Sequence, residues 1–588
     1  MMRKALLVLL TVSALLALAA AAYLWANVLV NSIYGYRTPL RGSPPLTEDI
    51  HPPLTSQVVL VLIDGLRYDA SLQMPYLNVL RQQGAQAQVI GHPPSNPQTA
   101  WTTLISGATP EINDIALFDR AYEWLEPISV DHVFSAVNRA GLTAGLAGSY
   151  WWEKLIPADL LYTKYFVDAQ DAAADQRVID RAMVFVKEFQ PNFLLVQLRE
   201  MDTVGQTYGG VSREYREAAL RCDAHIRSLS TAMDLHSVLI VVSSYGHVDA
   251  GGHGGAEAVV LNTPLIMAGE SILPRNYGSF DPEDLAPTIS ALLGTPTPAS
   301  AQGRIRSEML KMGELESAEN WVALARQRVR IGNVYLGSIA GGALRETAEA
   351  DMLVAISSLE VRNYKSAAEL ARLSVHETTQ EMAQARSARI WRERWSRAGP
   401  LALAVLVPLL LLWPRRSRRL FWSVLAALLA AAIYHVLFVQ QDNTYSFSRV
   451  PAGGLAATLT PSLQRAAVAL CAGAIFVLWQ AWRDQESSVF AVILRTYGYA
   501  ALQLYCISLV VSACTFWNGW RFGWYLPNFT VAYVHLAMLM QFMAVAVLAI
   551  PLPFLTVLLR RGLLALAGGN SARSRRNRTA RSNGRPLR

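Results

Sequence analysis

Cysteine is scarce in this chain, with four residues among 588, and only Cys222 precedes residue 471. A single thiol in that long stretch excludes a disulfide framework and a zinc site built from cysteines there. Charge is also scarce, since 16% of the residues are charged whereas 52% are hydrophobic. This balance is typical of a membrane protein that carries a polar domain. The length also exceeds what one domain usually contains.

Acidic residues are missing from Arg560 onward, where arginine is frequent, and the whole chain has a net charge of +8. Such a basic tail fits either a nucleic-acid-binding segment or a cytoplasmic flank that follows the positive-inside rule. We favour the flank, and we predict a membrane protein with no nucleic-acid partner.

Long hydrophobic runs predict the membrane segments. Residues 5–30 are almost continuously apolar, which predicts a transmembrane anchor within 1–35. The alternative is a cleaved signal peptide, because alanines at 17–22 offer cleavage sites. Five further spans are expected at 399–413, 420–439, 464–482, 492–516 and 529–559.

The hydropathy pattern divides the chain into six expected parts. They are an anchor (1–35), a proline-containing linker (36–56), an exported domain (57–305), a helical stalk (306–398), five transmembrane helices (399–560) and a basic cytoplasmic tail (561–588). With the N-terminus inside, the arginines at 415–419 and those of the tail also fall inside. We therefore expect a multi-pass plasma-membrane protein whose large domain is extracytoplasmic.

The exported domain alternates short apolar runs with amphipathic stretches. The runs are Val58–Ile63, Phe193–Leu198, Val238–Val242 and Pro264–Met267, and the amphipathic stretches include 178–189 and 213–230. This alternation predicts an α/β fold, a mixed but mostly parallel sheet with helices on both faces. Residues 305–398 instead predict long helices, including Ala323–Val329 and Ala348–Ser374.

Polar side chains follow several of these runs, at the sheet edge where α/β proteins bind ligands. Asp64 ends the first run and is followed by Gly65, so its carboxylate could reach a metal ion or simply cap a turn. Ser95, within Pro93-Pro94-Ser95-Asn96, could be an ordinary helix N-cap.

Four motifs together resemble the metal and nucleophile frame of the alkaline phosphatase superfamily, in its phosphodiesterase and GPI ethanolamine phosphate transferase branch. They are Ile63-Asp64-Gly65-Leu66-Arg67, the stretch from Pro93-Pro94-Ser95 to Gly107, Asp202 with Gly205, and the glycine-rich segment around His253. The resemblance implies an alkaline phosphatase-like fold. It also implies Ser95 as the nucleophile, Thr99 as the reserve candidate, and Asp64, Ser95, Asp202 and His253 as metal ligands.

The chain departs from this family pattern at three ligand positions. Gln206 stands where the family has a histidine, and Ser244 and Tyr245 stand where it has Asp and His. Gln206, His247 and Asp249 are the possible compensating ligands. The remaining groups fit one divalent ion better than two, zinc before manganese or magnesium, and the number of ions stays open.

Three interpretations of function follow. In the first, the protein is a membrane-anchored phosphodiesterase or phosphotransferase that acts on an extracytoplasmic phospholipid or glycolipid through Ser95 and a divalent metal. In the second, it is a catalytically degenerate relative that binds a phosphorylated lipid, glycan or partner protein. In the third, the C-terminal spans carry the function as a transporter or assembly module.

Overall fold

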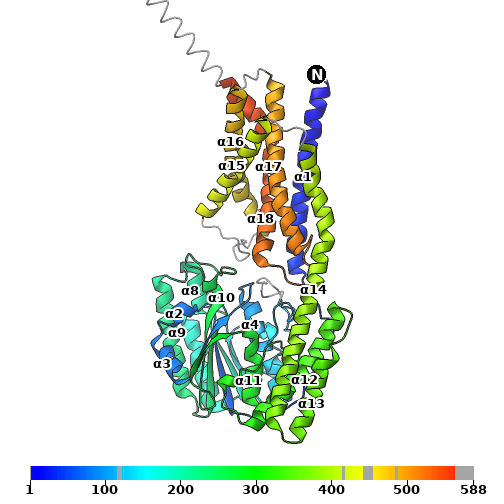
Figure 1. The fold of residues 1–588 in the computed structure, drawn as a ribbon. Coiled ribbons are helices and arrows are strands. Elements are labelled where there is room, and N and C mark those ends of the chain that lie inside the picture. Colours follow the sequence, from blue (N-terminus) through cyan, green and yellow to red (C-terminus); the bar gives the residue numbers. More distant parts are fainter. Residues whose placement is uncertain are drawn as a thin grey trace, which may run out of the picture.

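The computed structural model describes residues 2–40, 42–115, 122, 125–412, 418–441, 454–483 and 488–562. A globular α/β region lies at one end of the molecule, and long helices rise from it in a bundle (Figure 1). A group of stalk helices packs against the globular region and continues into this bundle.

One eight-stranded sheet forms the centre of the globular region. In spatial order its strands are β4 (Thr163–Val167), β3 (Ala144–Ser149), β5 (Phe193–Leu198), β1 (Gln57–Ile63), β6 (Ser237–Ser243), β7 (Asn262–Ala268), β2 (Ala85–Ile90) and β8 (Arg275–Phe280). β7 runs antiparallel to both of its neighbours, and the other pairs are parallel. The predicted mixed, mostly parallel sheet is confirmed.

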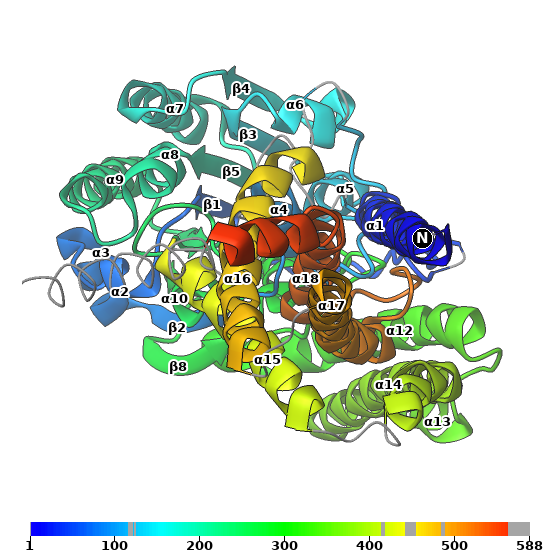
Figure 2. The same ribbon diagram turned by 90° about the horizontal axis from the view of Figure 1, so that it is seen from above.

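Helices cover both faces of this sheet, because alternate side chains of its buried strands point in opposite directions. Leu60 of β1 joins a core with α4 (Pro97–Ser106), α5 (Val133–Arg139) and α11 (Leu285–Leu293). Val61 joins a second core with α3 (Pro75–Gln83), α7 (Ala172–Val184) and α9 (Arg213–Ala232). Short helices complete the region: α2 (Tyr68–Ser71), α6 (Trp152–Leu155), α8 (Glu200–Tyr208) and α10 (Ala258–Leu261). Figure 2 shows the two layers from above.

Four of the eight strands coincide with the apolar runs in the sequence, namely β1, β5, β6 and β7. The others carry weaker signals. β3 is fully buried but consists mainly of alanine and glycine, and β8 lies at the sheet edge with an exposed, polar sequence. Their strand structure depends on pairing with neighbours rather than on an apolar run.

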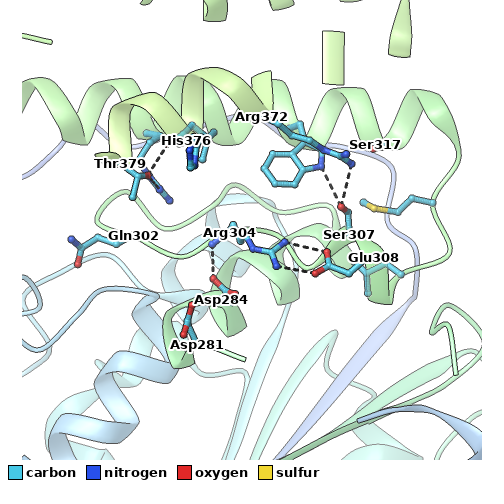
Figure 3. Close-up of a pocket in the computed structure, with 15 residues that line it drawn as sticks. Asp281, Asp284, Gln302, Arg304, Ser307, Glu308, Ser317, Arg372, His376 and Thr379 are labelled. Carbon is cyan, nitrogen blue, oxygen red and sulfur yellow. Dashed lines mark hydrogen bonds and ion pairs between the residues drawn. The ribbon is translucent and has the colours of Figure 1, made fainter. Parts of the chain in front are cut away.

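The stalk contains α12 (Glu314–Ile339), α13 (Glu346–Glu360) and the long α14 (Tyr364–Leu412). The helix expected over 348–374 is divided in two, because Arg362 adopts a positive φ of 61° and ends α13. A cavity of about 570 Å³ lies between α12, α14 and the segment around 302–312, as Figure 3 shows.

The remaining long helices form the membrane bundle. They are α1 (Met2–Tyr34), α15 (Arg418–Gln440), α16 (Gly454–Arg483), α17 (Val489–Asn518) and α18 (Phe529–Leu548). Within the described residues, five helices are long and apolar enough to cross a membrane, one in each of these elements. α18 is shorter than the expected span 529–559, because the helix is interrupted at 549–551, where Pro551 lies, and resumes at residue 552.

The expected span at 399–413 is the C-terminal end of α14 and is not one of those five. It nevertheless lies against the bundle, since the hydroxyl of Tyr505 in α17 donates to the carbonyl oxygen of Val405 at 2.7 Å. α14 thus runs without a break from the stalk into the expected span. Arg415, Arg416 and residues 563–588 of the predicted tail lie outside the described residues.

Candidate active site

Three adjacent strands bring the candidate residues to one edge of the sheet. β1 lies between β5 and β6 and is parallel to both. Asp64 therefore emerges beside the start of α8, which carries Asp202, and beside Ser244 at the end of β6. Buried parallel strands fix the position of whatever follows them, which is why the sites of α/β sheets lie at this edge.

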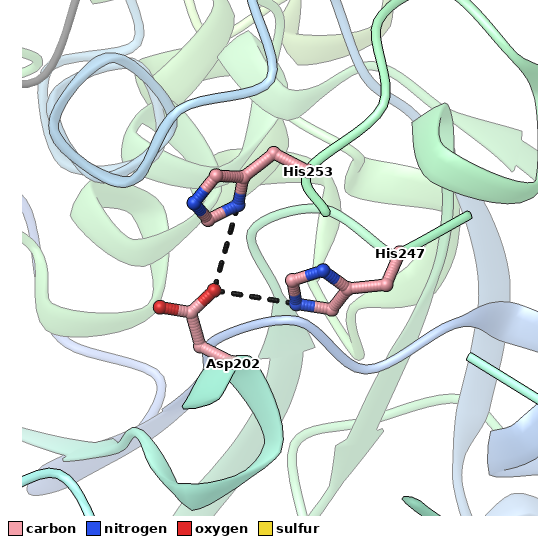
Figure 4. Close-up of side chains that lie close together, drawn as sticks. All are labelled: Asp202, His247 and His253. Atoms are coloured by element: carbon pink, nitrogen blue, oxygen red, sulfur yellow. Dashed lines mark ion pairs between the residues drawn. The ribbon is translucent and has the colours of Figure 1, made fainter. Parts of the chain in front are cut away.

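Asp202, His247 and His253 converge here on a common point (Figure 4). Oδ1 of Asp202 lies 3.2 Å from Nε2 of His247 and 3.5 Å from Nδ1 of His253. The His247 side chain is 0% exposed and that of His253 is 12% exposed. One carboxylate oxygen and two imidazole nitrogens form a donor set suited to a transition metal such as zinc.

A backbone contact orients the ring of His247. Its Nδ1 lies 3.0 Å from the carbonyl oxygen of Gly252, which can only accept, so Nδ1 carries a proton. Its Nε2 faces Oδ1 of Asp202 at 3.2 Å, and both atoms are electron-pair donors when neither carries a proton. Two such donors in contact require a cation or a proton between them.

Glycines make room for the His247 ring. A Cβ at Gly205 would lie 2.2 Å from Cδ2 of His247, and one at Gly65 would lie 2.6 Å from its Nε2. The loop that joins the two histidines turns at Gly251 and Gly252, with φ of 94° and 97°. These conformations favour glycine and fold the loop back onto α8.

We expect Gly205→Ala to weaken zinc binding roughly tenfold or more, because the new methyl group would displace the His247 ring from its ligating position. Chelator competition on the purified chain measures this affinity. Gly342→Ala is the matched control, since a Cβ there meets no atom within 4 Å. Equal zinc affinity in both variants would contradict ligation by His247.

Asp202 is held as an anion. Burial acts to raise its pKa, but the His247 and His253 imidazoles and the Arg199 guanidinium together hold the pKa well below its usual range. Tyr245 donates its hydroxyl to Oδ1 at 2.9 Å, and Nη2 of Arg199 donates to Oδ2 at 3.0 Å.

Asp64 is surrounded by donors from the protein itself. Its Oδ1 accepts from Nε1 of Trp101 at 2.6 Å and from the hydroxyl of Ser244 at 2.8 Å. Its Oδ2 accepts from Nε2 of Gln197 at 2.8 Å and lies 3.3 Å from Nε of Arg199. A carboxylate offers about four lone-pair positions, so little capacity remains here for a metal ion.

Arg199 is the buried cation between the two carboxylates. Its guanidinium contacts Asp64 and Asp202 and also lies over the rings of Trp101 and Trp151, with centroid distances of 5.4 and 5.6 Å. Complete burial raises the pKa of Asp64 to about 7, whereas the charge of Arg199 and the surrounding donors favour its ionised form. Arg199 is not among the site residues expected from the sequence. Its signal is a charged residue directly after a buried strand.

Ser95 precedes α4, whose N-cap is Asn96; the Asn96 side chain accepts from the backbone N–H of Thr99 at 2.9 Å. The hydroxyl of Ser95 donates to the backbone carbonyl of His253 at 3.2 Å. Ser95, Thr99 and Ser244 line one small cavity of about 20 Å³. The candidate nucleophile therefore touches the segment that carries one of the cluster histidines.

Two of the possible compensating ligands lie outside the cluster. Gln206 is exposed, and its backbone carbonyl accepts from the N–H of Gly252 at 3.1 Å. The Asp249 side chain is 68% exposed and pairs with Arg67 at 2.5 Å. Of the three, His247 alone joins Asp202 and His253 in the cluster found among the described residues.

Comparisons with known proteins agree with this architecture. Residues 58–312 match the family of type I phosphodiesterases and nucleotide pyrophosphatases. Human GPI ethanolamine phosphate transferase 2, catalytic subunit, is 25% identical over 292 residues, which are 45% of this chain and 29% of that protein. The catalytic subunit of mouse GPI ethanolamine phosphate transferase 3 is 23% identical over 301 residues, 46% of this chain and 27% of its own length. The chain thus matches less than a third of these two relatives.

Solved structures with similar folds include murine ectonucleotide pyrophosphatase/phosphodiesterase 5, with a TM-score of 0.35 and 14% identity over 41% of this chain and 96% of that one. A mutant of the alkaline phosphatase PafA has a TM-score of 0.36 and 11% identity over 44% of this chain and 100% of that one. The globular region is therefore similar in sequence to type I phosphodiesterases and nucleotide pyrophosphatases and to GPI ethanolamine phosphate transferases.

Proposed function

We propose that the protein is a membrane-bound phosphodiesterase or phosphotransferase, similar in chemistry to phosphoethanolamine transferases, that acts on an extracytoplasmic phospholipid or glycolipid. One observation carries the proposal: Asp202, His247 and His253 form a metal-type donor set, and the Ser95 hydroxyl contacts the backbone of that same His253. The similarity to GPI ethanolamine phosphate transferases supports the substrate class.

The donor set fits one divalent ion rather than two. Three protein ligands with an open fourth position are typical of catalytic zinc, and two imidazoles favour zinc over magnesium. The Asp64 side does not fit a second ion, because its oxygens already accept from Trp101, Ser244 and Gln197 and face Arg199. We infer that the fixed guanidinium supplies the positive charge there.

The residues have separate roles in this proposal. Ser95 Oγ attacks phosphorus, the bond to the leaving alcohol oxygen breaks, and water or an acceptor hydroxyl later displaces Ser95. The N-terminus of α4, directly after Ser95, favours a phosphoryl group through the helix dipole, since Pro97 has no N–H and the N–H of Thr99 is donated to Asn96. Arg199 and Tyr245 hold Asp202 in place. A bound zinc ion would stabilise negative charge on the phosphoryl oxygens.

The arrangement of the bundle supports the expected topology. The first residues of α1 lie at the end of the bundle away from the globular region, and α18 begins near that region and runs away from it (Figure 1). We propose that the globular region and stalk are extracytoplasmic in the plasma membrane, with the N-terminal end of α1 inside.

A second candidate function is binding of a phosphorylated lipid, glycan or partner protein without turnover. It is favoured by the Asp64 carboxylate, whose oxygens already accept hydrogen bonds from protein side chains. The family resemblance assigns Asp64 and Ser95 to the metal site, and Asp64 has little capacity left to ligate an ion beside Ser95.

One measurement distinguishes the two functions. It follows the turnover of labelled phosphatidylethanolamine in detergent micelles by the full chain in the presence of zinc. We expect Ser95→Ala to reduce release or transfer of phosphoethanolamine by roughly a thousandfold or more, because the proposed nucleophile is lost. Thr99→Val tests the reserve candidate in the same small cavity and should retain activity, whereas loss of turnover in Thr99→Val alone would assign the nucleophile to Thr99. Lipid binding by the parent protein with no turnover would instead support the second function.

A further inference from the structure

Arg328 of α12 is a buried cation with neutral partners. It is 2% exposed. Its Nη1 donates to the hydroxyl of Thr379 and its Nη2 to the backbone carbonyl of Gly303, both at 2.6 Å. Its Nε is buried and makes no hydrogen bond. Across the described ranges no carboxylate forms an ion pair with it. Burial lowers its pKa to about 10, which leaves the group charged at neutral pH.

A buried charge without a counter-ion is costly, so a protein usually neutralises it or binds an ion with it. Arg386 shows the usual solution nearby, since its Nε and Nη2 contact the two carboxylate oxygens of Glu111 at 2.7 and 2.5 Å. Among the described residues no carboxylate contacts Arg328 in this way, and Asp284 favours its charge only from a longer distance. This difference distinguishes Arg328 from Arg386.

Arg328 lines a cavity of about 510 Å³ between the globular region, the stalk and the membrane bundle. Thr379 and Met382 of α14 contribute one wall, and Leu526 and Phe529 at the start of α18 contribute another. His92 and Pro93, from the loop that leads to Ser95, also line it.

The charges of this cavity do not cancel. Glu111 and Arg386 neutralise each other, and His92 faces Glu283 at 3.1 Å. Arg328 remains as the charge that no described carboxylate contacts in this cavity. It also lines the cavity of Figure 3, where Arg304 pairs with Glu308 and where Asp284, which contacts Arg306 at 3.4 Å, favours the charge of Arg328 from a longer distance. Apolar walls and one buried cation, next to a helix long and apolar enough to span a membrane, suit an amphipathic anion.

We propose that this cavity is a lipid site in which Arg328 binds the phosphate group of an anionic lipid while Met382, Leu526 and Phe529 contact its chains. Guanidinium groups bind phosphate through charge-assisted, often bidentate hydrogen bonds. The site is separate from the Asp202 cluster and needs no turnover at Ser95. His92 and Pro93 place a bound lipid beside the loop that carries Ser95.

Calorimetric titration of the full chain in detergent with EDTA tests the site without metal chemistry, so its failure is distinguishable from failure of the proposed enzyme. The probe is dihexanoyl phosphatidic acid. We expect the parent protein to bind this lipid. Arg328→Gln should bind it roughly tenfold or more weakly, because the variant loses a charged hydrogen bond to the phosphate. Arg330→Gln on the same helix, where Arg330 donates only to the Leu46 carbonyl, should keep the parent affinity.

Two further probes identify the ligand. Dihexanoylglycerol, which lacks phosphate, should bind much more weakly, and equal binding would overturn the role of Arg328. Inorganic phosphate should also bind more weakly than the lipid, and equal or tighter binding would make this a free-phosphate site. Equal lipid binding by Arg328→Gln would overturn the proposal as well.

A second variant tests the site independently, in case Arg328→Gln misfolds. Ala383 is exposed on the cavity wall, so Ala383→Trp fills the space without removing a buried group. Loss of dihexanoyl phosphatidic acid binding in a monodisperse Ala383→Trp protein supports the site. Unchanged binding in this variant contradicts it.

Discussion

Zinc content should fall from about one ion per chain to none when His247 is replaced by alanine, because a three-ligand site loses its fully buried nitrogen. Nε2 of His247 lies 3.2 Å from Oδ1 of Asp202, so the two atoms can ligate one ion. The remaining carboxylate and one imidazole bind zinc weakly. Elemental mass spectrometry of the full chain, after dialysis and re-addition of zinc, measures the content.

His236→Ala is the matched control, since His236 is exposed and pairs with Glu270 away from the cluster. It should keep the parent zinc content. Two tightly held ions in the parent protein would contradict our inference that Asp64 does not ligate a second ion. No retained ion in the parent would favour binding without turnover as the function.

Replacing Arg199 with methionine should lower the free energy of unfolding by about 3–5 kcal/mol, the usual cost of leaving a buried charge without its partner. Arg199 contacts the buried carboxylates of both Asp64 and Asp202, which are acceptors on adjacent elements. Without it, the Asp202 anion loses a charged partner and the Asp64 carboxyl group loses the charge that favours its ionised form. The denaturation temperature of the full chain in detergent reports the loss.

A double variant tests the cause of this loss. Arg199→Met combined with Asp64→Asn removes one of the unpaired anions, so it should be more stable than Arg199→Met alone. Arg213→Met is the control, because Arg213 and its partner Glu217 are exposed and their pairing should have no measurable effect. An Arg199→Met protein as stable as the parent would contradict the role of Arg199 as internal counter-ion.

Arg199 and Arg328 are two buried guanidinium groups with different partners. Arg199 contacts two carboxylates within the protein, whereas Arg328 donates to a hydroxyl and a carbonyl and contacts no carboxylate among the described residues. The first therefore completes a site, and the second leaves a charge that an external ligand can satisfy.

Much of the fold follows from the sequence, because many buried strands and membrane helices carry their hydrophobic pattern within their own residues. The run at β1 is apolar on both sides and must be covered on both faces, and the apolar run that became α1 is too long for anything but a spanning or core helix. β3 lacked such a pattern, since its small residues are buried only through their neighbours.

One part of the candidate site also follows from the sequence, and the other part depends on the tertiary structure. Asp64, Ser95, Asp202 and His253 stand in motifs that the sequence alone presents, and parallel strands bring Asp64, Asp202 and the segment after β6 to one edge. Which of Gln206, His247 and Asp249 joins them depended on the loop turn at Gly251 and Gly252 and on the space left by Gly205. The place of Arg199 also depended on tertiary packing, because a cation pairs with the carboxylates that are nearest in space, and nearness in space is decided by the assembled sheet.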